Sequence, residues 1–100
     1  MNKFCTYGKF VAHEGKRDQL VEILLQAAES LESLDECHMY AVNISEDEPN
    51  AVWVVEFWQD EAAHTASLSL KSTKSLIQQG RPLIAAMEGN RLSVIGGKGI

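Results

Sequence analysis

Apolar residues recur along the chain with two different spacings, and these spacings predict its secondary structure. Residues 3–12 (KFCTYGKFVA) alternate loosely and are rich in Phe, Tyr and Val, which favours a strand. After Gly15 the apolar residues are three and four positions apart: Leu20, Ile23, Leu24, Ala27, Ala28, Leu31 and Leu34. This period places them on one face of an amphipathic helix of about five turns.

Two further strands are predicted in the middle of the chain, separated by a turn. Residues 37–45 (CHMYAVNIS) alternate, and the segment 46–50 (EDEPN) has the acidic residues, Pro and Asn that are typical of turns. The first of these strands places on one face His38, Tyr40, Val42 and Ile44.

Residues 51–58 (AVWVVEFW) predict a third strand that is apolar on both faces. One face carries Trp53, Val55 and Phe57, and the other carries Val52, Val54, Glu56 and Trp58. A strand of this kind must be covered on both sides.

The segment after the third strand is predicted to be helical. Asp60 is a good N-cap, and the negative charge of Glu61 in the first turn interacts favourably with the helix dipole. We therefore expect a helix from there to about Leu70 and a second, short helix over residues 72–79.

The chain then turns into a last strand. Gly80 stands where a C-cap glycine is expected, and Pro82 prevents the helix from continuing. Residues 83–87 (LIAAM) fit a helix or a strand equally well. Residues 91–95 predict the last strand, and residues 96–100 (GGKGI) predict a flexible tail without the pattern of a phosphate-binding loop.

The order of these elements predicts the fold. Strand, helix, strand, strand, helix pair and strand is the order of the split β-α-β unit of the ferredoxin-like α+β fold, with an antiparallel sheet. Two helices then cover one sheet face, and a second copy of the chain is the simplest cover for the other, since most soluble oligomers are symmetric homodimers. We predict a single domain over residues 1–100 that forms a homodimer.

Composition and charge exclude several classes of function. With 45% hydrophobic and 23% charged residues the chain is an ordinary globular domain, and its net charge of -5 disfavours a nucleic-acid partner. An apolar run long enough for a membrane span or a signal peptide is lacking, which predicts a cytoplasmic protein without a membrane partner. Cys5 and Cys37 stand alone in the sequence, so we expect free thiols and no metal site.

Residues 52–82 carry a resemblance to a known family. Their motif is an apolar strand ending in Glu-x-Trp, an acidic helix start and then Ala-His, here Glu56, Trp58, Asp60, Glu61, Ala63 and His64. On this motif and on its element order the chain resembles the antibiotic biosynthesis monooxygenase (ABM) family. The stretch CHMY at residues 37–40 is similar to the second strand of its quinol monooxygenase-like members.

The resemblance implies an architecture and a chemistry. It implies a dimeric α/β barrel in which two sheets pack face to face, with a pocket between sheet and helices in each subunit. It also implies oxidation of a quinol or phenolic small molecule by molecular oxygen without a cofactor. The haem-degrading branch is disfavoured, because Tyr7, Gly8 and Lys9 stand on the first strand in place of its Asn, and residues 71–80 hold no histidine.

The chemistry of such an enzyme suggests two catalytic candidates. A cofactor-free oxygenase needs a base for the phenol proton, a donor for the oxyanion and an apolar chamber. His64 suits the base, because imidazole ordinarily titrates close to neutral pH. Glu56 and Trp58 share a strand face, so both can line one pocket. A packing role for His64 and a structural pairing of Glu56 with Arg81 or Arg91 are the alternatives.

Four residues are candidate substrate contacts: Trp58, Tyr40, His38 and Arg81. Tyr40 could donate a hydrogen bond to a quinol, although burial against a helix explains it equally well, and Trp58 could be a core residue. Two other functions stay open. They are a non-catalytic small-ligand-binding dimer and an isomerase of the branch that handles quorum-signal sugars, whose phosphorylated substrate would need cations such as Arg81, Lys71 and Lys74.

Overall fold

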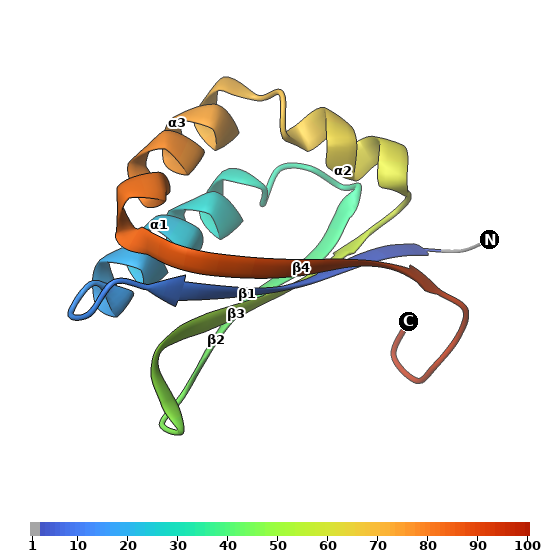
Figure 1. Cartoon of the computed structure of the whole chain (residues 1–100). Helices are drawn as coiled ribbons and strands as arrows, with labels where there is room; N and C mark the ends of the chain where they lie inside the picture. Colours follow the sequence, from blue (N-terminus) through green and yellow to red (C-terminus); the bar gives the residue numbers. More distant parts are fainter. Residues whose placement is uncertain (1–2) are drawn as a thin grey trace.

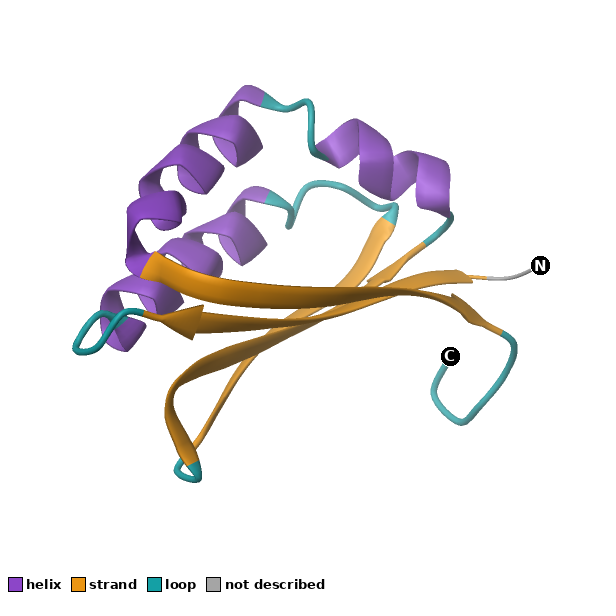
Figure 2. Cartoon of the chain, viewed as in Figure 1, coloured by secondary structure: helices purple, strands orange, loops and turns teal. Residues whose placement is uncertain are grey.

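A four-stranded antiparallel sheet with helices on one face forms the molecule, seen in a computed structural model that describes residues 3–100 (Figures 1 and 2). The strands are β1 (Lys3–Ala12), β2 (Cys37–Ser45), β3 (Glu48–Trp58) and β4 (Ile84–Val94), in the order β2-β3-β1-β4. The helices are α1 (Arg17–Ser30), α2 (Glu61–Ser67), α3 (Lys71–Gly80) and the short 3-10 helix η1 (Arg81–Leu83). This arrangement confirms the ferredoxin-like α+β class.

The first two predicted strands are confirmed to the residue, whereas the predicted turn between the second and third is too long. Only Glu46 and Asp47 form the turn, because β3 already begins at Glu48, which pairs with Ser45. Pro49 therefore lies in a strand, where the ladder between β2 and β3 is irregular and a missing backbone N–H costs little.

The first two helices are shorter than predicted, and the third is slightly longer than the predicted residues 72–79. Helix α1 ends at Ser30, and hydrogen-bonded turns, not helix, carry the chain to Leu34. Helix α2 ends at Ser67, and α3 begins at Lys71. The segment that fitted a helix or a strand belongs to β4 from Ile84 onward, so the last strand begins well before residue 91.

Gly80 does not act as a left-handed C-cap. Its φ of -78° is helical, and η1, with Pro82 inside it, follows directly. An added Cβ at Gly80 would lie 3.8 Å from the side chains of Leu20 and Ile23. These would be ordinary contacts, so Gly80 lies where α3 packs on α1 without being required for that packing.

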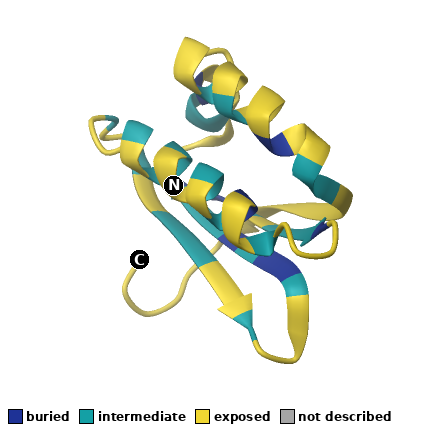
Figure 3. Ribbon diagram, turned by 90° about the vertical axis from the view of Figure 1, so that its left-hand side faces the viewer, coloured by how far each residue is buried: buried dark blue, intermediate teal, exposed yellow. Residues whose placement is uncertain are grey.

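The core lies between the helices and the sheet, in two clusters (Figure 3). Ala12, Leu20 and Val52 form the first cluster, beneath α1. Phe4, Leu31 and Trp58 form the second, with Ala63 of α2 packed against it. Full burial of one large apolar side chain stabilises a fold by about 1.5–3 kcal/mol, so the fully buried Trp58 anchors the second cluster.

The helices of residues 3–100 lie on one side of the sheet, so the opposite sheet face has no helix over it (Figure 1). Several apolar side chains on that face are exposed. Tyr7 is 43% exposed, Met39 41% and Leu92 46%. Val55 lies between them, opposite Tyr7 of β1 and Ala41 of β2. The prediction that the third strand carries apolar residues on both of its faces is therefore confirmed.

Candidate functional site

Strand register places four polar side chains in one row on the helix-covered face. Tyr40 of β2 pairs with Glu56 of β3, Glu56 pairs with Thr6 of β1, and Thr6 pairs with Arg91 of β4. Since side chains alternate along a strand, these four residues share the face that carries Trp58. The row therefore crosses the whole sheet beside the cluster of Phe4 and Trp58.

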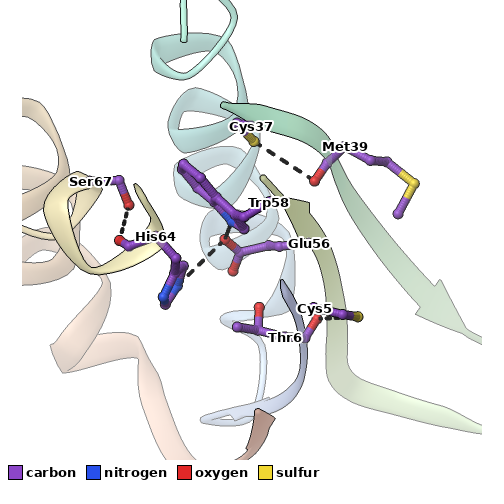
Figure 4. Close-up of polar contacts among 8 residues, drawn as sticks. All are labelled: Cys5, Thr6, Cys37, Met39, Glu56, Trp58, His64 and Ser67. Carbon is purple, nitrogen blue, oxygen red and sulfur yellow. Dashed lines mark hydrogen bonds and ion pairs between the residues drawn. The ribbon is translucent and has the colours of Figure 1, made fainter. Parts of the chain in front are cut away.

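The indole of Trp58 fixes the Glu56 carboxylate. Trp58 Nε1 donates a hydrogen bond of 3.0 Å to Glu56 Oε1 (Figure 4). The bond satisfies a fully buried indole N–H and supports a carboxylate whose side chain is only 17% exposed. Neither of the two arginines considered as structural partners of Glu56 pairs with it. Arg91 pairs with Glu61, and Arg81 lies in η1.

Helix α2 brings His64 to the same carboxylate. Asp60 Oδ1 accepts a hydrogen bond of 2.8 Å from the backbone N–H of Ala63, which confirms the predicted N-cap. Ser67 Oγ donates to the His64 carbonyl oxygen at 2.6 Å, so the peptide of His64 is held from within the helix. His64 Nε2 then lies 3.9 Å from Glu56 Oε1, which is ion-pair range when the imidazole is protonated.

Aromatic rings hold the imidazole on its other sides. The Trp58 ring meets the His64 ring edge-on, with centroids 5.5 Å apart and planes at 72°. The Phe4 ring lies 5.3 Å away at 45°. His64 is thus a largely buried imidazole with one carboxylate neighbour and apolar walls, an arrangement that suits a positioned base.

Burial and the charge of Glu56 affect the nearby acids. Burial first, and then the negative charge of Glu56, raise the pKa of the Tyr40 phenol well above its usual range. The same two causes raise the pKa of the Cys5 and Cys37 thiols, and both cysteines are free. At neutral pH Tyr40 is therefore a hydrogen-bond donor, and both thiols keep their protons.

An open groove of about 570 Å³ lies between α1 and β2. Residues 37–40 form one wall, and the C-terminal part of α1 with Leu31 forms the other. His38 sits there in a β-bulge, because Cys37 pairs with Trp58 while Met39 pairs with the adjacent Phe57. Tyr40 lines the groove, packs against the cluster of Trp58 and pairs with Glu56, so it connects the groove to the polar row.

The structure brings together most of the predicted site residues. Glu56, Trp58, His64 and Tyr40 lie together, and His38 lies on the groove beside Tyr40. Arg81 is at the other end of the sheet: η1 leads into Ile84, which pairs with Ala12, whereas Glu56 pairs with Thr6.

Sequence reasoning missed Phe4 and Thr6 as members of this site, and it considered Arg91 only as a partner of Glu56. The first strand's alternation does place Phe4 and Thr6 on one face. Which residues lie opposite them depends on strand order and register, for which a single sequence carries no local signal.

Within residues 3–100, no group of three His, Cys, Asp or Glu side chains is placed to hold a metal ion. In the same part of the chain, no helix combines the length and the apolar character needed to cross a membrane.

Comparison with known proteins gives a consistent match. The model of the family described as antibiotic biosynthesis monooxygenase (ABM) matches residues 4–79. A solved structure from Chloroflexus aurantiacus, named for the antibiotic biosynthesis monooxygenases, is 39% identical with a TM-score of 0.87 and covers 98% of each chain. No curated protein sequence is similar enough to count as a relative.

More distant structures share the fold. SnoaB from Streptomyces nogalater, a cofactor-independent oxygenase solved as a mutant, is 13% identical with a TM-score of 0.86 and covers 100% of each chain. A structure from Deinococcus radiodurans, also named for the antibiotic biosynthesis monooxygenases, is 19% identical with a TM-score of 0.81 and covers 97% of this chain and 95% of its own.

Proposed function

The chain belongs to the antibiotic biosynthesis monooxygenase family, and from this premise we propose that it is a cofactor-independent monooxygenase that oxidises a quinol or phenolic small molecule with molecular oxygen. The observation that carries the proposal is the approach of His64 to Glu56 among the rings of Trp58 and Phe4. SnoaB, which has the same fold, is itself a cofactor-independent oxygenase.

His64 begins the reaction by removing the phenol proton, and the phenolate then gives one electron to oxygen. The substrate radical and superoxide combine at a ring carbon, and the new peroxide takes a proton from the imidazolium. Loss of the ring C–H proton and cleavage of the O–O bond leave a carbonyl on the ring and release water. In total the substrate loses four electrons to O₂. One oxygen atom becomes the carbonyl oxygen of the product, and the other becomes the oxygen of water.

The surrounding residues assist this proton transfer. Glu56, 3.9 Å from Nε2, stabilises the imidazolium that forms, and the Trp58 indole holds Glu56 in place. Tyr40 keeps its proton, because burial and the charge of Glu56 raise its pKa, and it can donate to a substrate oxygen. Trp58 and Phe4 keep water away from the imidazole.

Oxygen uptake by chelator-treated protein tests the proposal against a panel of quinols and phenols. We expect uptake above the rate of autoxidation, and a loss of about 10²–10⁴-fold in His64→Ala. His13→Ala is the matched control, because His13 is an exposed loop histidine. No uptake with any member of the panel, or unchanged uptake in His64→Ala, overturns the proposal. Binding without turnover favours the ligand-binding alternative.

The proposed enzyme is a homodimer joined through the open sheet faces. Two observations support this assembly: Tyr7, Met39 and Leu92 are exposed on that face, and Val55 and Phe57 point to it from the central strand β3. A contiguous apolar sheet face of this kind is typical of an interface.

The isomerase alternative has less support. Lys71, Lys74 and Arg81, which would bind a phosphorylated sugar, lie on α3 and η1, and these elements pack mainly against α1 and each other.

A further inference from the structure

Two glycines face each other on the helix-covered side of the sheet, next to the polar row. Gly8 of β1 pairs with Gly89 of β4, one position further along the same face than Thr6 and Arg91. An added Cβ at Gly89 would meet no atom within 4 Å, and one at Gly8 would only make ordinary contacts at 3.6 and 3.7 Å. Glycine inside a strand weakens the strand and often marks a place where a ligand approaches closely.

The pair leaves a flat area of backbone beside Glu56. Val54, the next residue of β3 on this face, pairs with Gly8, so the flat area has an apolar boundary on the β3 side. Helix α3 packs mainly against α1 and η1, so its principal contacts are not with this part of the sheet. Because neither Gly8 nor Gly89 carries a side chain, an aromatic ring can approach the backbone here, beside the Phe10 side chain.

Arg91 stands at the outer end of this area. Its side chain is 74% exposed and donates from Nη2 to Glu61 Oε2, at the start of α2. Exposed ion pairs are weak, and a guanidinium has five N–H donors in a planar fork. Glu61 thus orients Arg91 toward the helix side, while the guanidinium N–H donors that do not contact Glu61 can still bind a second carboxylate.

The register gives the length of the ligand. Glu56 and Arg91 are separated by one strand, β1, and adjacent strands lie about 4.8 Å apart, so their backbones are about 10 Å apart. A hydroxyl at His64 and an acid at Arg91 then belong at opposite ends of a molecule about two fused rings long.

We propose that Arg91 is a specificity-determining residue that binds an acidic group at the far end of the substrate, while Gly8 and Gly89 form the floor beneath its ring. The substrate class is therefore a bicyclic hydroxy-aromatic acid. This inference rests on the proposed function, because it takes the hydroxyl-binding end from His64 and Glu56.

Binding of two air-stable probes tests the role of Arg91 without turnover. The probes are 6-hydroxy-2-naphthoate, with its hydroxyl and carboxylate at opposite ends, and 2-naphthol, which lacks the carboxylate. We expect calorimetry to show binding of the acid about tenfold tighter than that of the neutral probe. Arg91→Gln removes this preference, and Arg91→Lys retains part of it. Arg17→Gln, which removes a cation paired with Asp18 at the start of α1, leaves it unchanged.

Two substitutions at Gly89 test the floor. Because an added Cβ there meets no atom within 4 Å, Gly89→Leu is expected to fold and to weaken binding of both probes by about tenfold. Gly89→Ala should have a smaller effect, and the urea midpoints of both variants check that the fold is retained.

Several results overturn the inference. These are equal affinity for the two probes, a preference that depends on Arg81 instead of Arg91, unchanged binding in Gly89→Leu, and no binding of either probe at millimolar concentration. None of them affects the oxygen-uptake test with neutral quinols. Conversely, an acid preference that follows Arg91 in a protein without oxygen uptake rejects the monooxygenase and retains Arg91 only as the residue that binds the acidic group of a ligand.

Discussion

Trp58 donates a hydrogen bond of 3.0 Å to the carboxylate of Glu56, two residues earlier in the same strand. The acidic group of the site is therefore held by its own strand and needs no arginine to hold it. The oxygen that accepts this hydrogen bond, Glu56 Oε1, is also the one that lies nearest to His64 Nε2 (Figure 4).

Removing the indole N–H should destabilise the protein. Trp58→Phe leaves a small cavity and deprives a largely buried carboxylate oxygen of its donor, so we expect the free energy of unfolding to fall by roughly 2–3 kcal/mol. A double-mutant cycle with Glu56→Gln, followed by urea unfolding, should give a coupling of about 1 kcal/mol. Trp53→Phe, on the other sheet face, is the control. An equal loss there would contradict the role of the hydrogen bond.

Glu56→Gln should lower turnover without weakening substrate binding. The neutral amide keeps an acceptor for Trp58 but no longer stabilises the imidazolium of His64. We expect kcat for oxygen uptake to fall by about 10–100-fold, less than in His64→Ala, with KM nearly unchanged. A rise in KM at constant kcat would instead identify Glu56 as a substrate-binding residue.

The charge of Glu56 can also be detected through Cys37. Burial first, and then Glu56, raise the pKa of the Cys37 thiol, so little thiolate is present at pH 8. Glu56→Gln removes the second cause and should speed alkylation of Cys37 by iodoacetamide about two- to fivefold, read by peptide mass spectrometry. Glu61→Gln, which neutralises a carboxylate on α2, should not change the rate. Equal rates in all three proteins would show that burial alone controls the thiol.

Stability should decrease at alkaline pH because of Tyr40. Below about pH 10 the phenol is protonated in both the folded and the unfolded chain. Above that pH the unfolded chain loses the proton first, because burial and Glu56 raise the folded-state pKa of Tyr40, so the free energy of unfolding falls by up to about 1.4 kcal/mol per pH unit. Urea unfolding between about pH 8 and 11 should show a smaller decrease in Tyr40→Phe. The same slope in both proteins would exclude Tyr40 as the cause.

A charge on the open sheet face should separate the predicted dimer. Val55 points to that face, opposite Tyr7 and Ala41, so Val55→Glu leaves the core beneath the helices intact. We expect sedimentation to give a dimer for the native chain and 11.1 kDa for the variant, with unchanged circular dichroism. Gln78→Glu on the exposed side of α3 is the charge-matched control. A native chain that already sediments as a monomer would reject the dimer.

Local sequence patterns predicted two of the strands and the segment that carries Glu56, Trp58 and His64. The strands at residues 3–12 and 37–45 match to the residue, because both alternate and both end at clear turn signals. Glu56, Trp58 and His64 were predicted to lie together because a strand face and a capped helix follow each other directly in the sequence.

Long-range relationships were not predictable in the same way. The pairing of β1 with β4 places Arg91 in the row of Glu56. The same pairing places Arg81 at the far end of the sheet. Gly80 was misread because a glycine two residues before a proline is typical of a C-cap, whereas here the backbone stays helical at Gly80 and continues directly into η1.

The capped helix that follows β3 so closely has an evolutionary consequence. Glu56, Trp58, Asp60 and His64 belong to one uninterrupted segment, residues 56–64, and the N-cap of Asp60 forms within it. A stretch this short can be inherited, duplicated or grafted onto another sheet as a unit. Substitutions in β2 and β4 can then diversify the molecules that reach His64 while the segment that carries it stays the same.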